Sequence, residues 1–574
     1  MFFVERETGT SADILLAFGL ARLIGHIRGY NDLTIKDVGD AYCIIVDGPI
    51  VSEEIHQTAF ASFCDGIVVT TKKGRQEVDV PPQMKKDYEE YKKRNELFYE
   101  ALGSSNEDEL AQAEIARPHP DWPVWAVINH MSAMTTYNQL VELWYKHHDC
   151  FGELVEIILS IFQQRPNDIE TATKTWKALA QAKGINGKFK ASRLQIINPS
   201  MGKGYNRGKA DRLSSASGLS GFWVLEYLKF AGFYKTGISR VIKGEGIEDR
   251  KTYVLQPKEI TWLTHELLFE QFHERLFAQT AVKMDILSNL KYCRLFIEQW
   301  RDGQGNGFLD FLNGSPGDHV LGIEVTHYKK LKAFVTLNMS NFSLPIWLKV
   351  NSIKDANQYL EILDEHIRVI DQQHPREQKG HEYAFLRDYR DFLSGYDLQP
   401  FYRFMRLYIK HMASQLTARS YVPQFTVRNL EVLIMKHDKK LSMILNNIGF
   451  RNIAEAIRLS TVRPMYQKAN NQESIYEIRY GLGDKLLRNA RDRDDFVQEL
   501  GRFIHAYNRE NNRKKKEALA RKQIRMDISS GDIENIVALI DDETYDVHTI
   551  ASLLVSFGYA FDSSYSKKEG DLSQ

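Results

Sequence analysis

The chain has little cysteine, and the few cysteines that it has do not group. Cys43, Cys64, Cys150 and Cys293 are widely scattered, and no two of them form a CxxC pair. A zinc knuckle needs closely spaced thiolates, and a disulfide-stapled domain needs a dense framework of cysteines. The sequence therefore predicts neither of these, and it fits a protein of a reducing compartment.

An excess of charge of either sign is also missing. The 574 residues include 75 basic and 75 acidic side chains, so the formal net charge is zero. A chain without a global field can bind nucleic acid only through local basic patches. With 43% hydrophobic and 26% charged residues, the composition is that of a globular protein and not of a disordered or fibrous one.

Long hydrophobic runs are lacking as well. The N-terminus opens without a basic segment, and the apolar stretch 14–20 is soon interrupted by Arg22 and His26. This pattern predicts a buried amphipathic helix and neither a signal peptide nor a membrane span. We expect a cytoplasmic protein with no membrane partner, and the sequence has no repeat of solenoid period.

Catalytic signatures are missing too. There is no nucleophile elbow, no HExxH and no paired-carboxylate site of defensible spacing. The His-Asp dipeptide of metal phosphohydrolases occurs in His147-His148-Asp149 and in His437-Asp438, yet no further ligands follow at regular spacing, so surface or capping roles are expected. The prediction is a protein that is not an enzyme and has no catalytic residues, metal site or cofactor.

Hydrophobic periodicity predicts strands in the first part of the chain. Short runs rich in β-branched residues and bounded by turn residues are expected to form them. The predicted strands are 42–46, 66–71, 193–197, 238–243, 252–255, 323–327, 332–337 and 345–350.

Helical spacing dominates from residue 352 onward. The predicted helices of this part are 355–372, 381–393, 400–415, 427–446, 475–491, 495–525, 532–541 and 549–557. The predicted fold class is α+β and predominantly helical, with a mixed α/β N-terminal region that includes an antiparallel sheet, followed by a C-terminal helical bundle. Two domains are expected, 1–350 and 351–574.

The first candidate binding site is a glycine-rich basic loop at 198–217. Residues 188–212 include seven cations and one acid, Asp211. The glycine spacing does not match a nucleotide-binding P-loop, and Ala210 follows Lys209 where a magnesium-binding Ser or Thr is needed. Phosphates of nucleic acid suit the loop better, and an ordinary surface loop is the alternative. The predicted DNA-binding residues are Lys203, Tyr205, Asn206, Arg207 and Lys209.

A second glycine-rich loop, 303–307, contains two amide side chains. Gln304 and Asn306 can read base edges, or the loop can simply close a turn. The turn is the simpler interpretation, and both residues are retained as candidate DNA contacts.

The third candidate site is a cluster of eight cations between residues 509 and 525. An apolar helical stripe from Phe496 to Tyr507, with Asp494 as its cap, leads into this cluster. Only Glu510 and Glu517 oppose the cations, so the run favours nucleic acid over internal pairing, although a solvated helix end is the alternative. The predicted binding residues are Arg513, Lys514, Lys515, Lys516, Arg521 and Lys522.

Two stretches of the sequence resemble the large, signature subunit of type I CRISPR Cascade complexes, in its type I-B form. One is 479–483 (RYGLG), which continues through Leu487, Asp494-Asp495-Phe496, Leu500 and 506–508 to Asn511. The other is 217–223 (SGLSGFW), which continues through 225–230 to Gly232-Phe233. These are structural patterns without a catalytic signature.

The resemblance implies a non-catalytic subunit of an RNA-guided surveillance complex in antiviral defence. Its N-terminal region would cap the 5′ end of the CRISPR RNA and recognise the protospacer-adjacent motif (PAM), while the guide RNA reads the target sequence. A C-terminal, small-subunit-like bundle would help to open the DNA and stabilise the R-loop. The implied partners are CRISPR RNA, double-stranded DNA, displaced single-stranded DNA, the backbone, 5′-handle-binding and small subunits of Cascade, and a recruited helicase-nuclease.

Two other classes of protein remain open from the residues alone. One is a metal- or nucleotide-dependent nucleic-acid enzyme that uses Lys209 or a His-Asp pair. The other is a helical scaffold whose basic faces meet acidic proteins. ATP turnover or metal-dependent nuclease activity would identify the first, and the lack of RNA in a native pulldown would favour the second.

Overall fold

The computed structural model divides the chain into two compact units. It describes residues 1–58, 60, 66–71, 79–102, 119–185, 193–201, 222–244, 246–303, 315–345, 347–372, 380–395, 397–516 and 525–562. The first unit comprises Met1–Ala281 and Pro316–Leu344, and the second comprises Val282–Ser315 and Pro345–Gln574. With 62% helix and small, mainly antiparallel sheets, the predicted helix-rich α+β class is confirmed. The sequence analysis divides the chain at residue 350 into two domains with different functions, and this division stays a prediction.

The first unit contains two four-stranded antiparallel sheets and one short parallel pair. One sheet, ordered β1-β3-β2-β8, consists of β1 (Phe2–Glu5), β2 (Thr34–Asp37), β3 (Ala41–Ile45) and β8 (Glu259–Thr261). The other, ordered β10-β9-β7-β6, consists of β6 (Gly237–Val241), β7 (Arg250–Pro257), β9 (Val320–Lys330) and β10 (Phe334–Ser343). The parallel pair is β4 (Val68–Thr70) with β5 (Lys85–Asp87).

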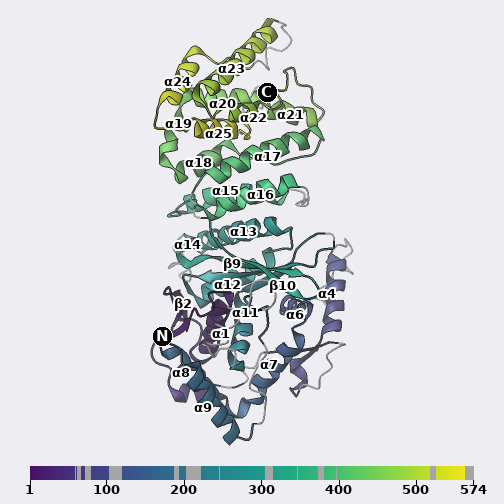
Figure 1. Cartoon of the computed structure of the whole chain (residues 1–574), viewed down its shortest axis with the longest axis vertical. Helices are drawn as coiled ribbons and strands as arrows, with labels where there is room; N and C mark the ends of the chain where they lie inside the picture. The colour runs from purple at the N-terminus through teal and green to yellow at the C-terminus, as the bar shows by residue number, and fades with distance from the viewer. Residues whose placement is uncertain are drawn as a thin grey trace. The chain divides into compact units, whose positions relative to one another are not determined.

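Helices pack around these sheets (Figure 1). The helices of the first unit are α1 (Ser11–Arg28), α2 (Ser52–Gln57), η1 (Pro82–Met84), α4 (Tyr88–Leu102), α6 (Trp122–His130), α7 (Met134–Lys146), η2 (His148–Cys150), α8 (Phe151–Gln163), α9 (Ile169–Ala182), α11 (Trp223–Thr236), α12 (Trp262–Arg275) and α14 (Pro316–His319). Most side chains of α1 and α11 are buried, so these two helices form the centre of the unit.

The crossing of α1 and α11 brings their backbones unusually close. A Cβ atom on Gly19 of α1 would lie 1.9 Å from the carbonyl oxygen of Leu228, and a Cβ atom on Gly232 of α11 would lie 1.9 Å from that of Leu15. Neither distance is possible for a real side chain, because the contact would be with backbone atoms that cannot rotate away. Glycine at these two positions is therefore what allows the helices to pack.

The described residues of the second unit contain helices and connecting segments but no strand, apart from an isolated bridge between Thr426 and Phe561. Its helices, teal to yellow in Figure 1, are α13 (Ala281–Asp302), α15 (Ile353–Asp371), α16 (Gly380–Ser394), α17 (Gln399–Thr417), α18 (Val427–His437), η4 (Lys439–Leu441), α19 (Ser442–Asn446), α20 (Ile448–Ser460), α21 (Val462–Ala469), α22 (Leu482–Asn489), α23 (Arg493–Lys516), α24 (Ser530–Asp541) and α25 (Val547–Gly558).

Two predicted strands are wrong. Residues 193–197 form a turn in which the backbone N–H groups of Ile197 and Asn198 donate to the carbonyl of Leu194, at 3.2 and 3.0 Å. At 345–350, the carbonyl of Pro345 accepts a hydrogen bond from the Tyr359 hydroxyl at 2.6 Å, not from a neighbouring strand. A short apolar run fits a buried turn as well as a strand, and hydrophobicity alone does not separate them.

Three predicted helix boundaries in the second unit are also wrong. The predicted helix 427–446 is interrupted at Asp438, whose side chain accepts from Lys440 N at 2.9 Å. Residues 475–481 are not helical, and α22 begins only after Gly481, which has a left-handed φ of 75°. The cap of α23 is Asp492 and not Asp494, because Asp492 accepts from the N–H groups of residues 494 and 495.

Gly232→Ala is expected to destabilise the first unit by about 1–3 kcal/mol or more, because the added methyl group must push two backbones apart. Thermal and urea unfolding midpoints measure the effect. Gly501→Ala on the exposed face of α23 is the matched control, since no atom lies within 4 Å of its Cβ position. That change should stabilise the helix by about 0.5–1 kcal/mol. Equal midpoints for Gly232→Ala and the parent protein would contradict the close-packing explanation.

Candidate functional site

The predicted binding residues divide into those that the structure describes and those that it does not. Arg513, Lys514, Lys515 and Lys516 form the last turn of α23. The residues that lie outside the described ranges are Lys203, Tyr205, Asn206, Arg207, Lys209, Gln304, Asn306, Arg521 and Lys522. What the structure adds for the loop 198–217 is therefore the arrangement of its first four residues.

Helix α23 is apolar and buried along one face and basic at its C-terminal end. The predicted stripe is confirmed, with five of its side chains buried and Val497 half-buried. The last two turns carry the exposed side chains of Arg509, Arg513, Lys515 and Lys516. Lys515 forms an ion pair with Asp527, which lies in the segment leading to α24. This end of the helix presents several cations to solvent on a well-packed support.

The basic cluster is smaller than the sequence predicts, because Arg525 is buried. Its guanidinium lies 3.5 Å from the centre of the Tyr476 ring and 5.8 Å from that of Tyr507. Burial lowers the pKa of Arg525 to about 10. Glu510 does not oppose the cluster either, since it is buried and accepts hydrogen bonds from Glu477 N at 2.7 Å and from Arg479 Nη2 at 3.0 Å.

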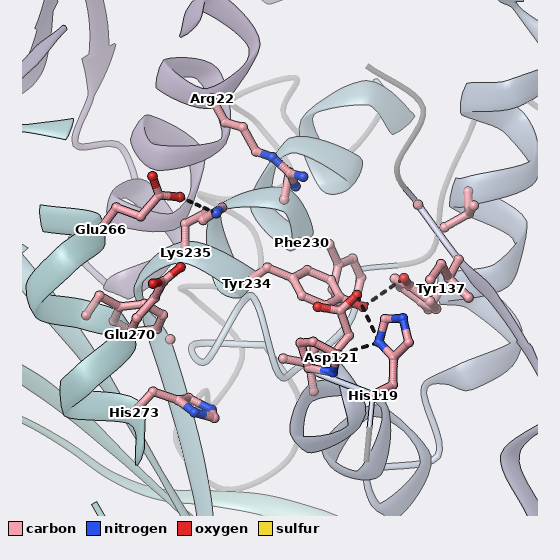
Figure 2. Close-up of a pocket in the computed structure, with 18 of the residues that line it drawn as sticks. Arg22, His119, Asp121, Tyr137, Phe230, Tyr234, Lys235, Glu266, Glu270 and His273 are labelled. Carbon is pink, nitrogen blue, oxygen red and sulfur yellow. Dashed lines mark hydrogen bonds and ion pairs between the residues drawn. The ribbon is translucent and has the colours of Figure 1, made fainter. Parts of the chain in front are cut away.

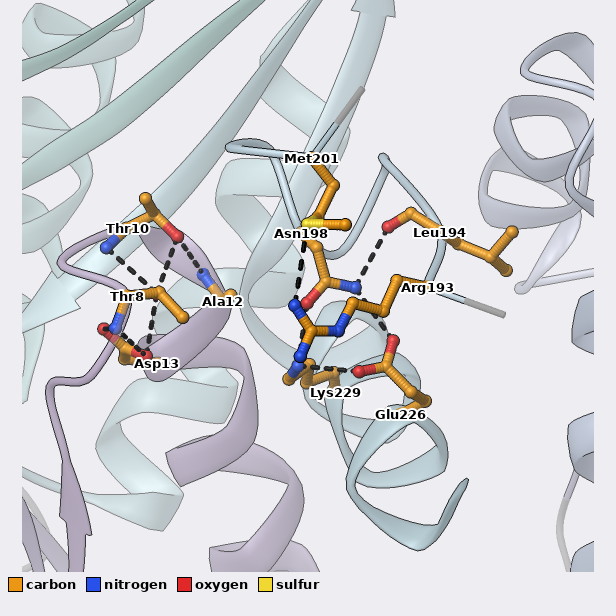
Figure 3. Close-up of polar contacts among 10 residues, drawn as sticks. All are labelled: Thr8, Thr10, Ala12, Asp13, Arg193, Leu194, Asn198, Met201, Glu226 and Lys229. Carbon is orange, nitrogen blue, oxygen red and sulfur yellow. Dashed lines mark hydrogen bonds and ion pairs between the residues drawn. The ribbon is translucent and has the colours of Figure 1, made fainter. Parts of the chain in front are cut away.

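The first residues of the loop 198–217 are held by a buried polar network (Figure 3). Asn198 accepts from Lys229 Nζ at 2.7 Å and donates to Glu226 Oε2 at 2.8 Å. Lys229 and Glu226, both on α11, form an ion pair of 2.8 Å, and each is almost completely buried. The Thr336 hydroxyl donates to the carbonyl of Pro199 at 2.7 Å. The chain therefore leaves a fixed position on α11 and β10 when it enters the basic loop.

A second polar cluster in Figure 3 holds the N-terminus of α1. Asp13 accepts from the hydroxyl of Thr8 and the N–H of Gly9, both at 2.8 Å, and burial raises the pKa of Asp13 to about 6. Glu324 of β9 accepts from Ser11 N at 2.5 Å, and burial raises its pKa to about 7. Carboxyl groups stabilise a helix N-terminus, so the burial of Asp13 and Glu324 at the start of α1 is explained by a structural role.

A cavity of about 590 Å³ lies beside α11 and α12 in the first unit. Figure 2 shows Glu266, Glu270 and His273 of α12 on one side of it, with Arg22 of α1 reaching toward the same space. Lys235 is paired with Glu266 at 2.5 Å. Burial lowers the pKa of His273 to about 4, so its ring is neutral at pH 7.

The opposite wall of this cavity carries a hydroxyl pair and a carboxyl group. The hydroxyls of Tyr137 and Tyr234 lie 2.9 Å apart, and burial raises the pKa of both. Burial also raises the pKa of Asp121 and lowers that of His119. Within the described residues, no three His, Cys, Asp or Glu side chains are grouped so that they could hold a metal ion. Sequence reasoning missed the cavity because its lining comes from several segments that are distant in sequence.

The two His-Asp dipeptides occupy different environments. His147 is fully buried, with its ring 5.1 Å from Trp223 and 4.7 Å from Trp176, so a surface position is wrong for this residue. Its aromatic neighbours explain the burial. His147 is nevertheless the C-cap residue of α7, and its Nδ1 atom contacts the carbonyl of Leu143. His148 and Asp149 are exposed, and Asp438 is a capping residue, as predicted.

Comparisons with known proteins give no relative from which a function can be taken. No protein-family model matches the chain, and no curated protein or solved structure matches it significantly. Among the described helices, none combines the length and the apolar character that are needed to cross a membrane. A functional assignment therefore has to come from the residues themselves.

Lys229→Met is expected to destabilise the first unit by about 3–5 kcal/mol, because it leaves the Glu226 carboxylate buried without its cation. Unfolding midpoints of the single variant and of Lys229→Met with Glu226→Gln measure the effect, and the double variant should recover most of the loss. Lys174→Met is the control, since its ion pair with Glu170 is exposed and screened by water, so its loss should leave the unfolding midpoint nearly unchanged. Equal decreases of the unfolding midpoint in Lys229→Met and Lys174→Met would show that the buried ion pair contributes no more to stability than the exposed one.

Proposed function

We propose that the chain is a nucleic-acid-binding protein, and specifically the non-catalytic large subunit of a type I-B-like Cascade complex. The single observation that supports this most is the form of α23. Its apolar face is buried, and its last two turns display exposed cations to solvent. Because a rigid helix fixes the spacing of its cations, such an end is suited to the regularly spaced phosphates of a nucleic acid.

The residues that carry the resemblance lie at structurally important positions. Residues 479–483 lead into α22, and 494–511 belong to α23. Arg479 and Glu510 join these two stretches by an ion pair of 3.0 Å, with Glu510 buried. The described part of the other stretch, from Phe222 to Phe233, leads into and forms most of α11. Both stretches that carry the resemblance therefore consist largely of residues that pack in this fold, and the proposed family assignment rests on such positions and not on a catalytic site.

The loop 198–217 is proposed to contact DNA near the PAM through Lys203, Tyr205, Asn206, Arg207 and Lys209. The fixed position of Asn198 supports this proposal, because a loop anchored at its start loses less freedom when it binds. Gln304 and Asn306 are secondary candidates for the same contact. Arg521 and Lys522, which lie outside the described residues, stay candidate DNA contacts by their sequence alone.

In the proposed complex, base pairing to CRISPR RNA selects the target and this subunit recognises the PAM, helps to open the duplex and stabilises the displaced strand. The backbone, 5′-handle-binding and small subunits would be its protein partners, and a recruited helicase-nuclease would cut the DNA. The protein would act in the cytoplasm, without a cofactor and without chemistry of its own.

A native pulldown of the full chain with the products of neighbouring genes, followed by sequencing of the bound RNA, tests this proposal. Repeat-derived guide RNA is the expected result. A preparation without RNA would favour the scaffold alternative, and ATP turnover or metal-dependent nuclease activity would favour the enzyme alternative. RNase treatment before capture is the control for RNA that binds after lysis.

The exposed cations of α23 should give DNA binding a strong dependence on salt. Each neutralised phosphate contributes about −0.9 to the slope of log affinity against log salt for duplex DNA. Arg513→Gln with Lys516→Gln is therefore expected to reduce the slope by about 1.8. Fluorescence anisotropy measures this slope in titrations between roughly 50 and 200 mM salt, the range over which such contacts weaken.

Lys174→Gln with Lys177→Gln is the matched control, because both lysines are exposed and lie on α9 of the first unit. This control removes the same charge and should leave the slope unchanged. Equal slopes in the parent protein and in the α23 variant would mean that the basic end of α23 is only a solvated surface.

A further inference from the structure

The second unit contains a cavity of about 540 Å³. It lies where α15, α20 and α21 meet two non-helical segments, 421–426 and 560–562. The two segments are joined by backbone hydrogen bonds, from Val427 N to Phe561 O at 2.9 Å and from Phe561 N to Phe425 O at 2.8 Å. The pocket is thus built from parts of the chain that are far apart in sequence but fixed to each other.

Large aromatic side chains line this pocket and remain accessible. Tyr421 is 72% exposed and Phe561 is 45% exposed. A third ring, Tyr466, is held in place by its hydroxyl, which donates to the carbonyl of Val422. Exposed aromatic rings gathered at one cavity are typical of a binding site, because a flat ligand can cover them and remove apolar surface from water.

Guanidinium groups accompany the rings. Arg458 is 9% exposed, and it is fixed by donation to the carbonyls of Ala560 at 2.7 Å and Phe557 at 2.8 Å and by an ion pair with Asp562 at 3.3 Å. Arg368 and Arg463 also line the pocket. Three arginines against the two acids Glu455 and Asp562 give the lining an excess of positive charge.

We propose that this pocket binds one nucleotide unit, with the base stacked on the exposed rings and the phosphate held by the arginines. Base stacking on aromatic side chains and planar recognition of phosphate by guanidinium are the two interactions that the lining offers together. Gln424 and Glu455 add an amide and a carboxylate that can meet the polar edge of a base.

The choice of a nucleotide among flat anions rests on the proposed function. The same chemistry is presented by a free mononucleotide and by a single nucleotide of a strand. None of the residues that line the pocket belongs to α23. The pocket therefore makes a separate contribution that can be removed without touching the exposed cations.

The test uses the full chain and two probes, AMP and a single-stranded 5-iododeoxyuridine oligonucleotide that forms photochemical cross-links to aromatic residues in contact with a base. Peptide mapping is expected to place cross-links at Tyr421 or Phe561. Tyr421→Leu with Phe561→Leu should weaken binding about fivefold or more, since stacking contributes about 1–3 kcal/mol per base. Arg368→Gln, an exposed change outside the core, should weaken binding without altering the unfolding midpoint.

Tyr383→Leu, an exposed aromatic change on α16, is the control and should have no effect. Tight binding of AMP that the double variant loses would identify a free nucleotide as the ligand, and an effect confined to the oligonucleotide would identify a strand. Oligonucleotide binding with cross-links only elsewhere, unchanged in both pocket variants, would overturn the pocket and leave the proposed function intact. Binding of AMP in the pocket without binding of any polynucleotide would support the pocket and overturn the proposed function. Binding of neither probe would overturn both the pocket and the proposed function.

Discussion

The backbone contact between α1 and α11 is the constraint on which the arrangement of the first unit depends. Gly19 and Gly232 allow it, and both helices then carry functional groups to fixed places. Helix α11 supplies the buried Glu226–Lys229 pair that holds Asn198 and also the cavity residues Tyr234 and Lys235. A shift of α11 along α1 would therefore move the loop anchor and the cavity wall together. This coupling follows from close packing, since a packed core transmits displacements instead of absorbing them.

A similar device recurs in the second unit around α20. A Cβ atom on Gly449 would lie 2.2 Å from the carbonyl oxygen of Asp532 in α24, and one on Gly558 of α25 would meet Ile457 at 2.6 Å. Helix α20 is thus tightly held on two sides. This fixes Glu455 and Arg458 at the wall of the aromatic pocket, which is the cavity that Tyr421 and Phe561 line. In both units, glycine determines how closely helices approach, and polar residues on the same helices determine what the resulting surfaces can bind.

The sequence predicts the fold class and much of the helical pattern, because periodicity depends only on neighbouring residues. The stripe from Phe496 to Tyr507 is the clearest case. What periodicity does not show is which charged residues are buried, so Arg525 and Glu510 were both assigned to a surface cluster that they do not belong to. Helix α20 was missed, although it carries Arg458, and the aromatic pocket depends on contacts such as that of Phe561 with residues 425–427. Of the predicted site, only the turn Arg513–Lys516 lies within the described residues.

The two compact units are interleaved along the chain, and this limits how the protein can be divided. The chain leaves the first unit after Ala281, contributes α13 to the second, and returns at Pro316 to supply β9 and β10. A fragment that stops at Ala281 would expose the edge of β7, whose ladder is completed by β9. A fragment that runs to residue 350 would carry α13 without the helices that cover it. No single scission yields both units whole, so any attempt to express one half alone has to rejoin its two segments by a linker.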